Sequence, residues 1–121
     1  AALKAAGDDT TMAATHKRLS VARDALSEAT DWVVATMPSD AAAGAAPSAP
    51  YLKLFGITAG GWMMARAALA AKDGSEDPEY LKAKMTTVRH YADHILTQAP
   101  ALTDAITADG GTVMSFAVDQ F

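Results

Sequence analysis

The chain of 121 residues is long enough for one domain with a single core. Half of the residues are hydrophobic, and much of that half is alanine, which is the best helix former and adds little side-chain volume. The composition therefore predicts an all-α fold with closely spaced helices. Ten basic and fourteen acidic side chains give a net charge of −4, which argues against a nucleic-acid partner. The absence of cysteine excludes disulfides and thiolate chemistry and favours a cytoplasmic protein.

The sequence shows no clear targeting segment. The longest nearly uncharged run, Leu54 to Ala71, is interrupted by Arg66 and is shorter than the ~20 apolar residues that span a bilayer. The first residues, Ala1-Ala2-Leu3-Lys4, lack the basic region and apolar core of a signal peptide. We therefore expect no membrane span. Because the sequence does not begin with methionine, we also expect it to be a piece of a longer protein.

A linker is predicted at residues 1–10, where Gly7-Asp8-Asp9-Thr10 is typical of a flexible segment that ends in a helix cap. The helical domain is expected to span residues 11–121. Its first helix runs from Thr11 to Met37 and ends at Pro38, whose ring cannot continue the hydrogen-bond ladder. Apolar residues spaced three and four apart indicate packing at a shallow crossing angle; they are Met12, Leu19, Ala22, Leu26, Ala29 and Val33.

The second helix is predicted from Pro50 to Lys72, and the other helices are expected to be arranged around it. Between residues 50 and 69 only Lys53 and Arg66 are charged, and a helix that is apolar on nearly every side must be enclosed by others. Its larger side chains recur at helical spacing: Tyr51, Leu54, Phe55, Thr58, Trp62, Ala65 and Leu69. The connection from Pro38 to Pro50 is long for a bundle, so we expect it to cross one end or to contain a short helical turn.

The segment Asp73-Gly74-Ser75-Glu76-Asp77-Pro78 separates the second helix from the third. We expect Gly74 to close the second helix in the left-handed conformation, Asp77 to cap the third helix and Pro78 to occupy its first turn. The third helix, Glu79 to Gln98, is predicted to bury Leu81, Met85, Val88, Tyr91, Ala92 and Ile95.

A short fourth helix is predicted over residues 101–108, with an apolar stripe of Leu102, Ala105 and Ile106. The tail from Thr112 to Phe121 is too apolar to lie free in water, so it should pack on this domain or on a neighbour. The predicted fold is thus an up-and-down bundle of three main helices, with a short fourth helix and an apolar C-terminal tail.

The histidines are the first candidates for chemistry. His90 and His94 lie four residues apart on one helix and could face one metal ion, but a third ligand is not evident, and a solvated helix face is the favoured interpretation. His16 could be the phosphorylated residue of a histidine phosphotransfer bundle, although the sequence Lys17-Arg18-Leu19 after it does not fit the His-x-x-Lys-Gly pattern of such domains. The sequence therefore predicts no catalytic, cofactor-binding or metal-binding residues.

The second helix also carries residues that are unusual in a helix interior. Gly60-Gly61 weakens a helix by about 1 kcal/mol per residue, and we interpret it as close contact with a neighbouring helix rather than as space for a ligand. Arg66 must reach solvent, pair with an acidic residue such as Asp31, or face another domain. Trp32 and Trp62 are interpreted as core side chains rather than as stacking platforms.

Two sequences in the second helix are distinctive: Pro50-Tyr51-Leu52-Lys53-Leu54-Phe55-Gly56 and Ala59-Gly60-Gly61-Trp62. Supporting segments are Ala29-Thr30-Asp31-Trp32-Val33, Arg66-Ala67-Ala68-Leu69-Ala70, Tyr80-Leu81-Lys82-Ala83-Lys84, Arg89-His90-Tyr91-Ala92-Asp93-His94-Ile95-Leu96 and Val113-Met114 with Phe121. Together they resemble the extra C-terminal helical domain of a bacterial subgroup of acyl-CoA dehydrogenases, which includes 3-methylmercaptopropionyl-CoA dehydrogenase-like and long-chain enzymes. The resemblance runs from Leu19 to Phe121.

The resemblance implies that this chain is the non-catalytic accessory domain of a flavoprotein. The parent enzyme would remove two hydrogens across the α,β bond of an acyl-CoA, with FAD and a glutamate base in upstream domains. The domain would pack on those upstream domains or at a subunit interface of a homo-oligomer, and a contact with acyl-CoA is left open. The candidate interface residues are Arg66, Trp62, Phe116 and Phe121. The alternative is a free-standing helical interaction or oligomerisation module.

An accessory domain should differ from such a module in its surface. When it is separated from its partner, it should expose an apolar patch larger than the few hundred Å² that is usual for a monomer, on the order of 300–600 Å². A self-contained module should not, unless it oligomerises.

Overall fold

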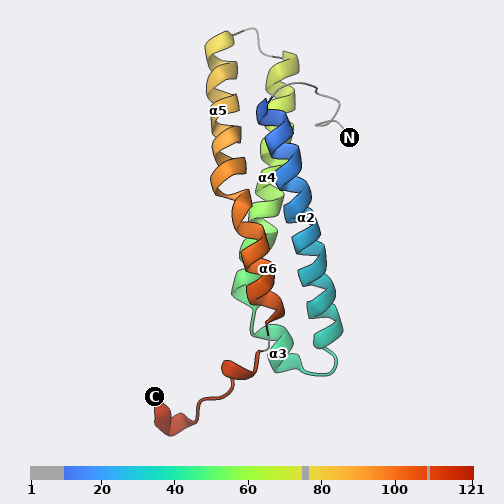
Figure 1. Cartoon of the computed structure of the whole chain (residues 1–121), viewed down its shortest axis with the longest axis vertical. Helices are drawn as coiled ribbons and strands as arrows, with labels where there is room; N and C mark the ends of the chain where they lie inside the picture. The colour runs from blue at the N-terminus through green and yellow to red at the C-terminus, as the bar shows by residue number, and fades with distance from the viewer. Residues whose placement is uncertain (1–9, 75–76, 109) are drawn as a thin grey trace.

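The computed structural model describes residues 10–74, 77–108 and 110–121. These residues form an up-and-down bundle in which α2 (Thr10–Thr36) and α4 (Ser48–Gly74) are the longest helices. Figure 1 shows the third side of the bundle, where α5 (Pro78–His94) continues into α6 (Ala99–Thr107). Most of the described residues are helical and none forms a strand, so the predicted all-α bundle is confirmed.

Short elements connect and follow the main helices. The five-residue helix α3 (Ala41–Ala45) closes one end of the bundle between α2 and α4, and a 3-10 turn, η1 (Leu96–Gln98), joins α5 to α6. The predicted helical turn in the long connection is therefore confirmed. Two further 3-10 turns, η2 (Gly110–Thr112) and η3 (Val118–Gln120), lie in the C-terminal segment, which Figure 1 shows extending away from the α3 end of the bundle.

The predicted helix ends follow from local chemistry. The first helix ends at Thr36, shortly before Pro38, and the Asp40 side chain then accepts a hydrogen bond from the Ala43 backbone N–H at 3.1 Å to begin α3. The linker predicted at residues 1–10 lies outside the described residues except for Thr10, which is the first residue of α2.

The start of the third helix is also confirmed. Asp77 Oδ1 accepts hydrogen bonds from the backbone N–H groups of Glu79 and Tyr80, at 3.0 and 3.4 Å, and Pro78 occupies the first turn. The prediction for Gly74 was wrong, because this residue is the last helical residue of α4 and does not adopt a left-handed conformation. Helix α5 ends at His94 rather than at Gln98 because the chain tightens there into the 3-10 turn η1.

Alanine dominates the core, as the composition predicts. The main cluster joins α2, α4, η1 and α6 with one buried residue at the end of α5, and consists of Ala22, Ala25, Ala29, Leu54, Ala92, Leu96, Ala99 and Ile106. A smaller cluster of Met12, Ala68 and Val88 lies nearer the start of α2. Of the residues predicted to be buried in the third helix, Val88 and Ala92 are buried, whereas the larger ones are only half-buried: Leu81, Met85, Tyr91 and Ile95.

The apolar stripe predicted for the fourth helix is partly wrong. Ile106 is buried, but Ala105 is exposed and Leu102 is half-buried. Thr103 is buried in their place, because its hydroxyl donates a hydrogen bond to the Ala25 carbonyl of α2 at 3.0 Å. A buried threonine with a satisfied hydroxyl does not register in a pattern that counts only apolar residues.

Tyrosine hydroxyls also link the helices. Tyr51 of α4 lies 2.8 Å from the Thr30 hydroxyl of α2, which itself donates to the Leu26 carbonyl, so the Tyr51 hydroxyl is the donor between them. The Tyr91 hydroxyl of α5 donates to the Ile57 carbonyl of α4 at 2.8 Å. Because alanine contributes little apolar area, these half-buried hydrogen bonds, each worth about 1 kcal/mol, help to hold the bundle together.

The glycine pair in α4 lies in close contact with α5 and η1. A Cβ atom built on Gly61 would lie 2.7 Å from Leu96 Cδ2 and 3.2 Å from its Cγ, and one built on Gly60 would overlap the Tyr91 hydroxyl. Leu96 is fully buried, so it has little room to move. Close contact with a neighbouring element is therefore the reason for Gly60-Gly61, as predicted.

We expect Gly61→Ala and Gly56→Ala to change stability in opposite directions. Nothing lies within 4 Å of a Cβ built on Gly56, so alanine there should stabilise α4 by about 0.5–1 kcal/mol through helix propensity. At Gly61 the same gain is outweighed by overpacking against Leu96, which costs about 1–3 kcal/mol. Urea unfolding of both variants, followed by circular dichroism, measures the difference. Stabilisation by Gly61→Ala would show that Leu96 can move aside.

Candidate functional site

One side of α4 is not covered by the bundle. Large apolar side chains of this helix are exposed, whereas its buried residues lie along one face, at Leu54, Thr58, Gly61, Ala65, Ala68 and Ala71. The exposed fractions are 72% for Leu52, 53% for Phe55, 54% for Trp62 and 54% for Met63. The prediction that other helices enclose α4 was therefore wrong, because α2, α5 and α6 all pack against the same half of it.

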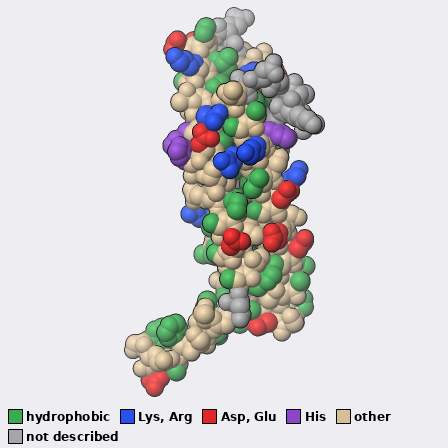
Figure 2. Space-filling view, viewed as in Figure 1, with side chains coloured by type: hydrophobic (Ala, Val, Ile, Leu, Met, Phe, Trp, Pro, Cys, Tyr) green, Lys and Arg blue, Asp and Glu red, His purple; other side chains and the backbone are tan. Residues whose placement is uncertain are grey.

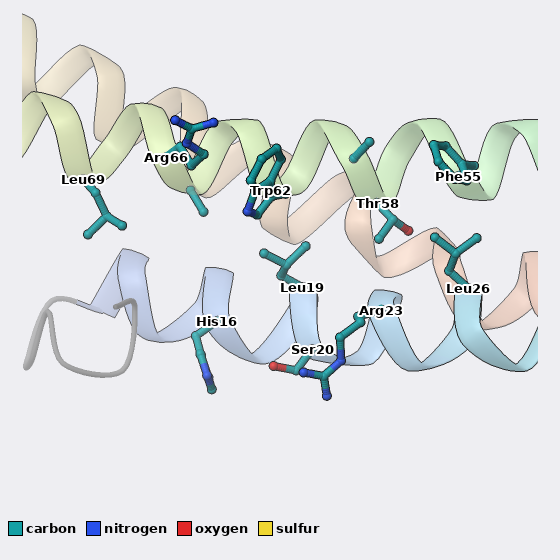
Figure 3. Close-up of a pocket in the computed structure, with 12 residues that line it drawn as sticks. His16, Leu19, Ser20, Arg23, Leu26, Phe55, Thr58, Trp62, Arg66 and Leu69 are labelled. Atoms are coloured by element: carbon teal, nitrogen blue, oxygen red, sulfur yellow. The ribbon is translucent and has the colours of Figure 1, made fainter. Parts of the chain in front are cut away.

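Part of this uncovered surface is a groove between α2 and α4, which we call the α2–α4 groove. It encloses about 540 Å³ and is lined by His16, Leu19, Ser20, Arg23, Leu26, Phe55, Thr58, Ala59, Trp62, Ala65, Arg66 and Leu69. Figure 3 shows that Leu19 and Leu26 extend from α2 toward α4, with Trp62 opposite Leu19. The groove is thus lined mainly by apolar side chains, and Figure 3 shows His16 and Arg23 extending away from α4.

The charged groups of the α2–α4 groove are cationic. The Arg66 guanidinium lies 4.9 Å from the centre of the Trp62 ring, which is the geometry of a cation–π contact. Arg23 is paired with Asp24 at 2.9 Å, but the lining residues include no carboxylate. Among the described residues Arg66 forms no ion pair, so the suggested pairing with Asp31 is not observed.

The two tryptophans differ in environment. Trp32 is half-buried and packs against the main core cluster, as predicted. Trp62 was expected in the core but is 54% exposed, because it lies at the edge of the α2–α4 groove and not on the buried face of α4. Its assignment as a candidate interface residue stays a prediction.

A second surface on the same helix lies beside the groove. Leu52, Gly56, Met63 and Ala70 are all exposed and are spaced by four or seven residues, so they lie on one side of the helix. None of them lines the α2–α4 groove. We call these four residues the outer face of α4, and it is uncharged.

By length and composition, α4 could cross a membrane, with a mean hydropathy of 1.2. The expectation of no span rested on the ~20 apolar residues that a bilayer requires, whereas an 18-residue stretch of this helix is enough to make it a candidate. Core helices of soluble proteins pass the same test, and α4 packs one face against the bundle, so this is weak evidence for a span.

The tail does not pack on its own bundle. Its large side chains are strongly exposed, from 62% to 95%, at Val113, Met114, Phe116, Val118 and Phe121. Figures 1 and 2 show this apolar segment standing away from the helices. The Phe116 and Phe121 rings pack against each other, with their centres 5.8 Å apart. We predicted that the tail packs either on its own domain or on a neighbouring one. These residues do not pack on their own domain, and packing on a neighbour stays a prediction.

The four candidate interface residues therefore form two pairs. Trp62 and Arg66 are in contact at the α2–α4 groove, and Phe116 and Phe121 are in contact in the tail. One copy of the chain does not bring the pairs together (Figure 1). Sequence reasoning missed Leu52 and Met63 of the outer face and expected Phe55 to be enclosed. Leu19 and Leu26 pack against the main core cluster, as expected, and also line the groove. The sequence did contain a signal for these exposed residues: α4 has more apolar surface than two or three partner helices can cover.

The histidines of α5 lie on a mixed-charge surface. The His90 and His94 rings are 4.7 Å apart, and Arg89 Nε donates to Asp93 Oδ2 at 2.8 Å. Figure 2 shows basic and histidine side chains gathered on the upper half of the bundle. Among the described residues, no group of three or more histidine, aspartate or glutamate side chains could hold a metal ion. His16 lies apart, at the α2–α4 groove.

Sequence comparison places the chain in a family. A family model described as acetyl-CoA dehydrogenase C-terminal like matches residues 1–117. The chain belongs to this family. It is also 35% identical, over 104 residues, to a 3-methylmercaptopropionyl-CoA dehydrogenase of Ruegeria pomeroyi. That match covers 82% of this chain but only 17% of the relative. No solved structure matches the chain.

The family result confirms the resemblance to the C-terminal domain of acyl-CoA dehydrogenases. The α2–α4 groove of this C-terminal domain is lined mainly by apolar side chains, with Arg66 among its polar residues.

We expect the Arg89–Asp93 pair to contribute a small, pH-dependent stabilisation. The Arg89 hydrogen bond holds the pKa of Asp93 below its usual value, against an opposing effect of desolvation. A carboxyl with a depressed folded-state pKa stabilises the fold above its unfolded pKa of about 3.9, and this stabilisation is lost as the pH falls through the folded value. Asp93→Asn should therefore lower stability at pH 7, and its difference from the parent chain should shrink toward pH 3.

Urea unfolding at the two pH values measures this difference, and Arg89→Gln with Asp93→Asn is the matched double variant. If Asp93→Asn costs the same at pH 7 and pH 3, the ion pair is not the cause.

Proposed function

We propose that this domain is the non-catalytic accessory domain of an FAD-dependent acyl-CoA dehydrogenase and packs on the dehydrogenase body through the outer face of α4. The observation that carries the proposal is the match itself: the chain is similar to 17% of a protein named as an acyl-CoA dehydrogenase and belongs to a family named for a C-terminal region. The remaining length of such a protein is where we place the α,β-dehydrogenation chemistry.

The described residues do not fit an FAD site. A flavin ring and its diphosphate need several convergent hydrogen-bonding groups, commonly at a glycine-rich turn that begins a helix. The α2–α4 groove offers mainly apolar side chains, and the hydroxyl of Thr58 already donates to the Leu54 carbonyl within its own helix. We therefore place FAD in the upstream part of the parent enzyme.

The outer face of α4 has the properties of a surface that another protein covers. Leu52 and Met63 are large, apolar and exposed, and the small residues Gly56 and Ala70 between and beyond them would allow a partner to approach closely. Complete burial of a leucine or methionine side chain stabilises a complex by about 1.5–3 kcal/mol. An exposed apolar surface of this kind on an isolated domain marks an interaction site.

We expect Met63→Glu to weaken binding to the dehydrogenase body at least tenfold without unfolding the domain. A buried, unpaired carboxylate at the interface costs more than the ~1.4 kcal/mol that corresponds to a tenfold change. The matched control is Val34→Glu, at an apolar residue of α2 that is 67% exposed and lies on a different helix. Circular dichroism checks that both variants fold.

The measurement is calorimetric titration of this chain into a dehydrogenase body that ends before Ala1, with FAD retention and acyl-CoA turnover as further readouts. Saturable binding that Met63→Glu weakens and Val34→Glu does not is the expected result. A folded body and a folded domain that do not associate, with full activity of the body alone, would instead favour a free-standing interaction module.

A further inference from the structure

Two apolar features of the chain are left without a partner, and they are separate from the outer face of α4. One is the α2–α4 groove, and the other is the segment Val113–Phe121, which we call the apolar tail. The apolar tail leaves the bundle near α3, where Gly110 lies close to Ala43, and then extends away from the helices (Figure 1). Each feature exposes side chains that burial would stabilise.

The apolar tail contains a hydrogen-bonded turn. The Gln120 side-chain oxygen accepts a hydrogen bond from the Ala117 backbone N–H at 2.7 Å, and the Gln120 N–H donates to the Ala117 carbonyl at 3.0 Å. This turn brings the Phe116 and Phe121 rings into contact. A segment that already holds two aromatic rings together loses less conformational freedom when it binds.

The apolar tail and the groove complement each other in chemistry. The tail presents aromatic and aliphatic side chains with one charge, Asp119, and it contains no lysine or arginine. The groove presents apolar walls, including Leu19 and Leu26, with cationic Arg66 among its lining residues, whereas the charge of Arg23 is paired with Asp24. In a complex of the tail with the groove, the acidic Asp119 would lie near the cationic Arg66 while the aromatic rings contact the apolar walls.

We propose that the apolar tail of one copy binds in the α2–α4 groove of a second copy. Phe116 and Phe121 fill the space between Leu26, Phe55 and Trp62, and Asp119 lies beside Arg66. In a pair related by twofold symmetry the exchange is reciprocal, so both tails and both grooves are covered at once. A second copy is favoured over the same copy because the tail is directed away from its own bundle.

Engineered cysteines test this placement, because the chain contains none of its own. Val118→Cys labels the apolar tail, where the side chain is 92% exposed, and Ala59→Cys labels the groove. The two variants are mixed and oxidised gently, and disulfide-linked heterodimers are quantified on a non-reducing gel. The matched control replaces Ala59→Cys by Ala83→Cys, an exposed alanine on α5. We expect at least tenfold more heterodimer with Ala59→Cys than with Ala83→Cys.

Sedimentation velocity of the unmodified chain provides the second test. The parent chain should dimerise, and Phe121→Asp should raise the dimer dissociation constant at least tenfold while the fold is retained, because Phe121 is 95% exposed in the single copy. Tyr80→Asp, at an aromatic residue of α5 that is 52% exposed, should leave dimerisation unchanged.

Three outcomes overturn the proposal: equal cross-linking at Ala59 and Ala83, a parent chain that stays monomeric at all concentrations, or a chain carrying both Val118→Cys and Ala59→Cys that cross-links only within itself. The last would place the tail in its own groove. These experiments use this chain alone, so their failure leaves docking on the dehydrogenase body untouched, and that docking is tested through Met63.

Discussion

The close approach of α4 to the segment after α5 is the constraint on which the rest of the bundle depends. Gly61 has no side chain because Leu96 occupies that space, and Gly60 leaves room for the Tyr91 hydroxyl to reach the Ile57 carbonyl. The buried alanines of α2 continue the same design, in which helices are held at short distance by small residues. A core built in this way is thin, and it covers only one half of a helix that is apolar almost all round.

Features of the fold that depend on local chemistry were predictable from the sequence. The start of α5 follows from Asp77 and Pro78, because a carboxylate that accepts backbone N–H groups and a ring that fixes φ favour a helix start in any surroundings. The end of α2 before Pro38 follows from the geometry of proline in the same way. The apolar spacing of α2 was also sufficient, because that helix has a polar side and thus a single orientation that satisfies both sides.

Orientation was not predictable for α4, because periodicity carries little information when most positions are apolar. Phe55 and Trp62 were assigned to the interior on account of size, yet small residues such as Gly61 and Ala65 occupy the buried face. The sequence also does not show how many helices pack around α4. The same limit applies to the tail: its composition shows that Phe116 and Phe121 require a partner, but not where that partner lies. The sequence therefore identified some residues of the candidate site but not how they are arranged in space.

The uncovered half of α4 gives this domain two binding surfaces on one rigid element. The outer face, with Leu52 and Met63, and the groove, with Trp62 and Arg66, lie beside each other along the helix and share no residue. Under our two proposals, a dehydrogenase body covers the outer face and the tail of a second copy occupies the groove. Because α4 is packed tightly through Gly61, the two partners would be fixed in orientation relative to each other, not merely tethered. The small alanine-rich core thus leaves half of this helix exposed for contacts with other protein surfaces.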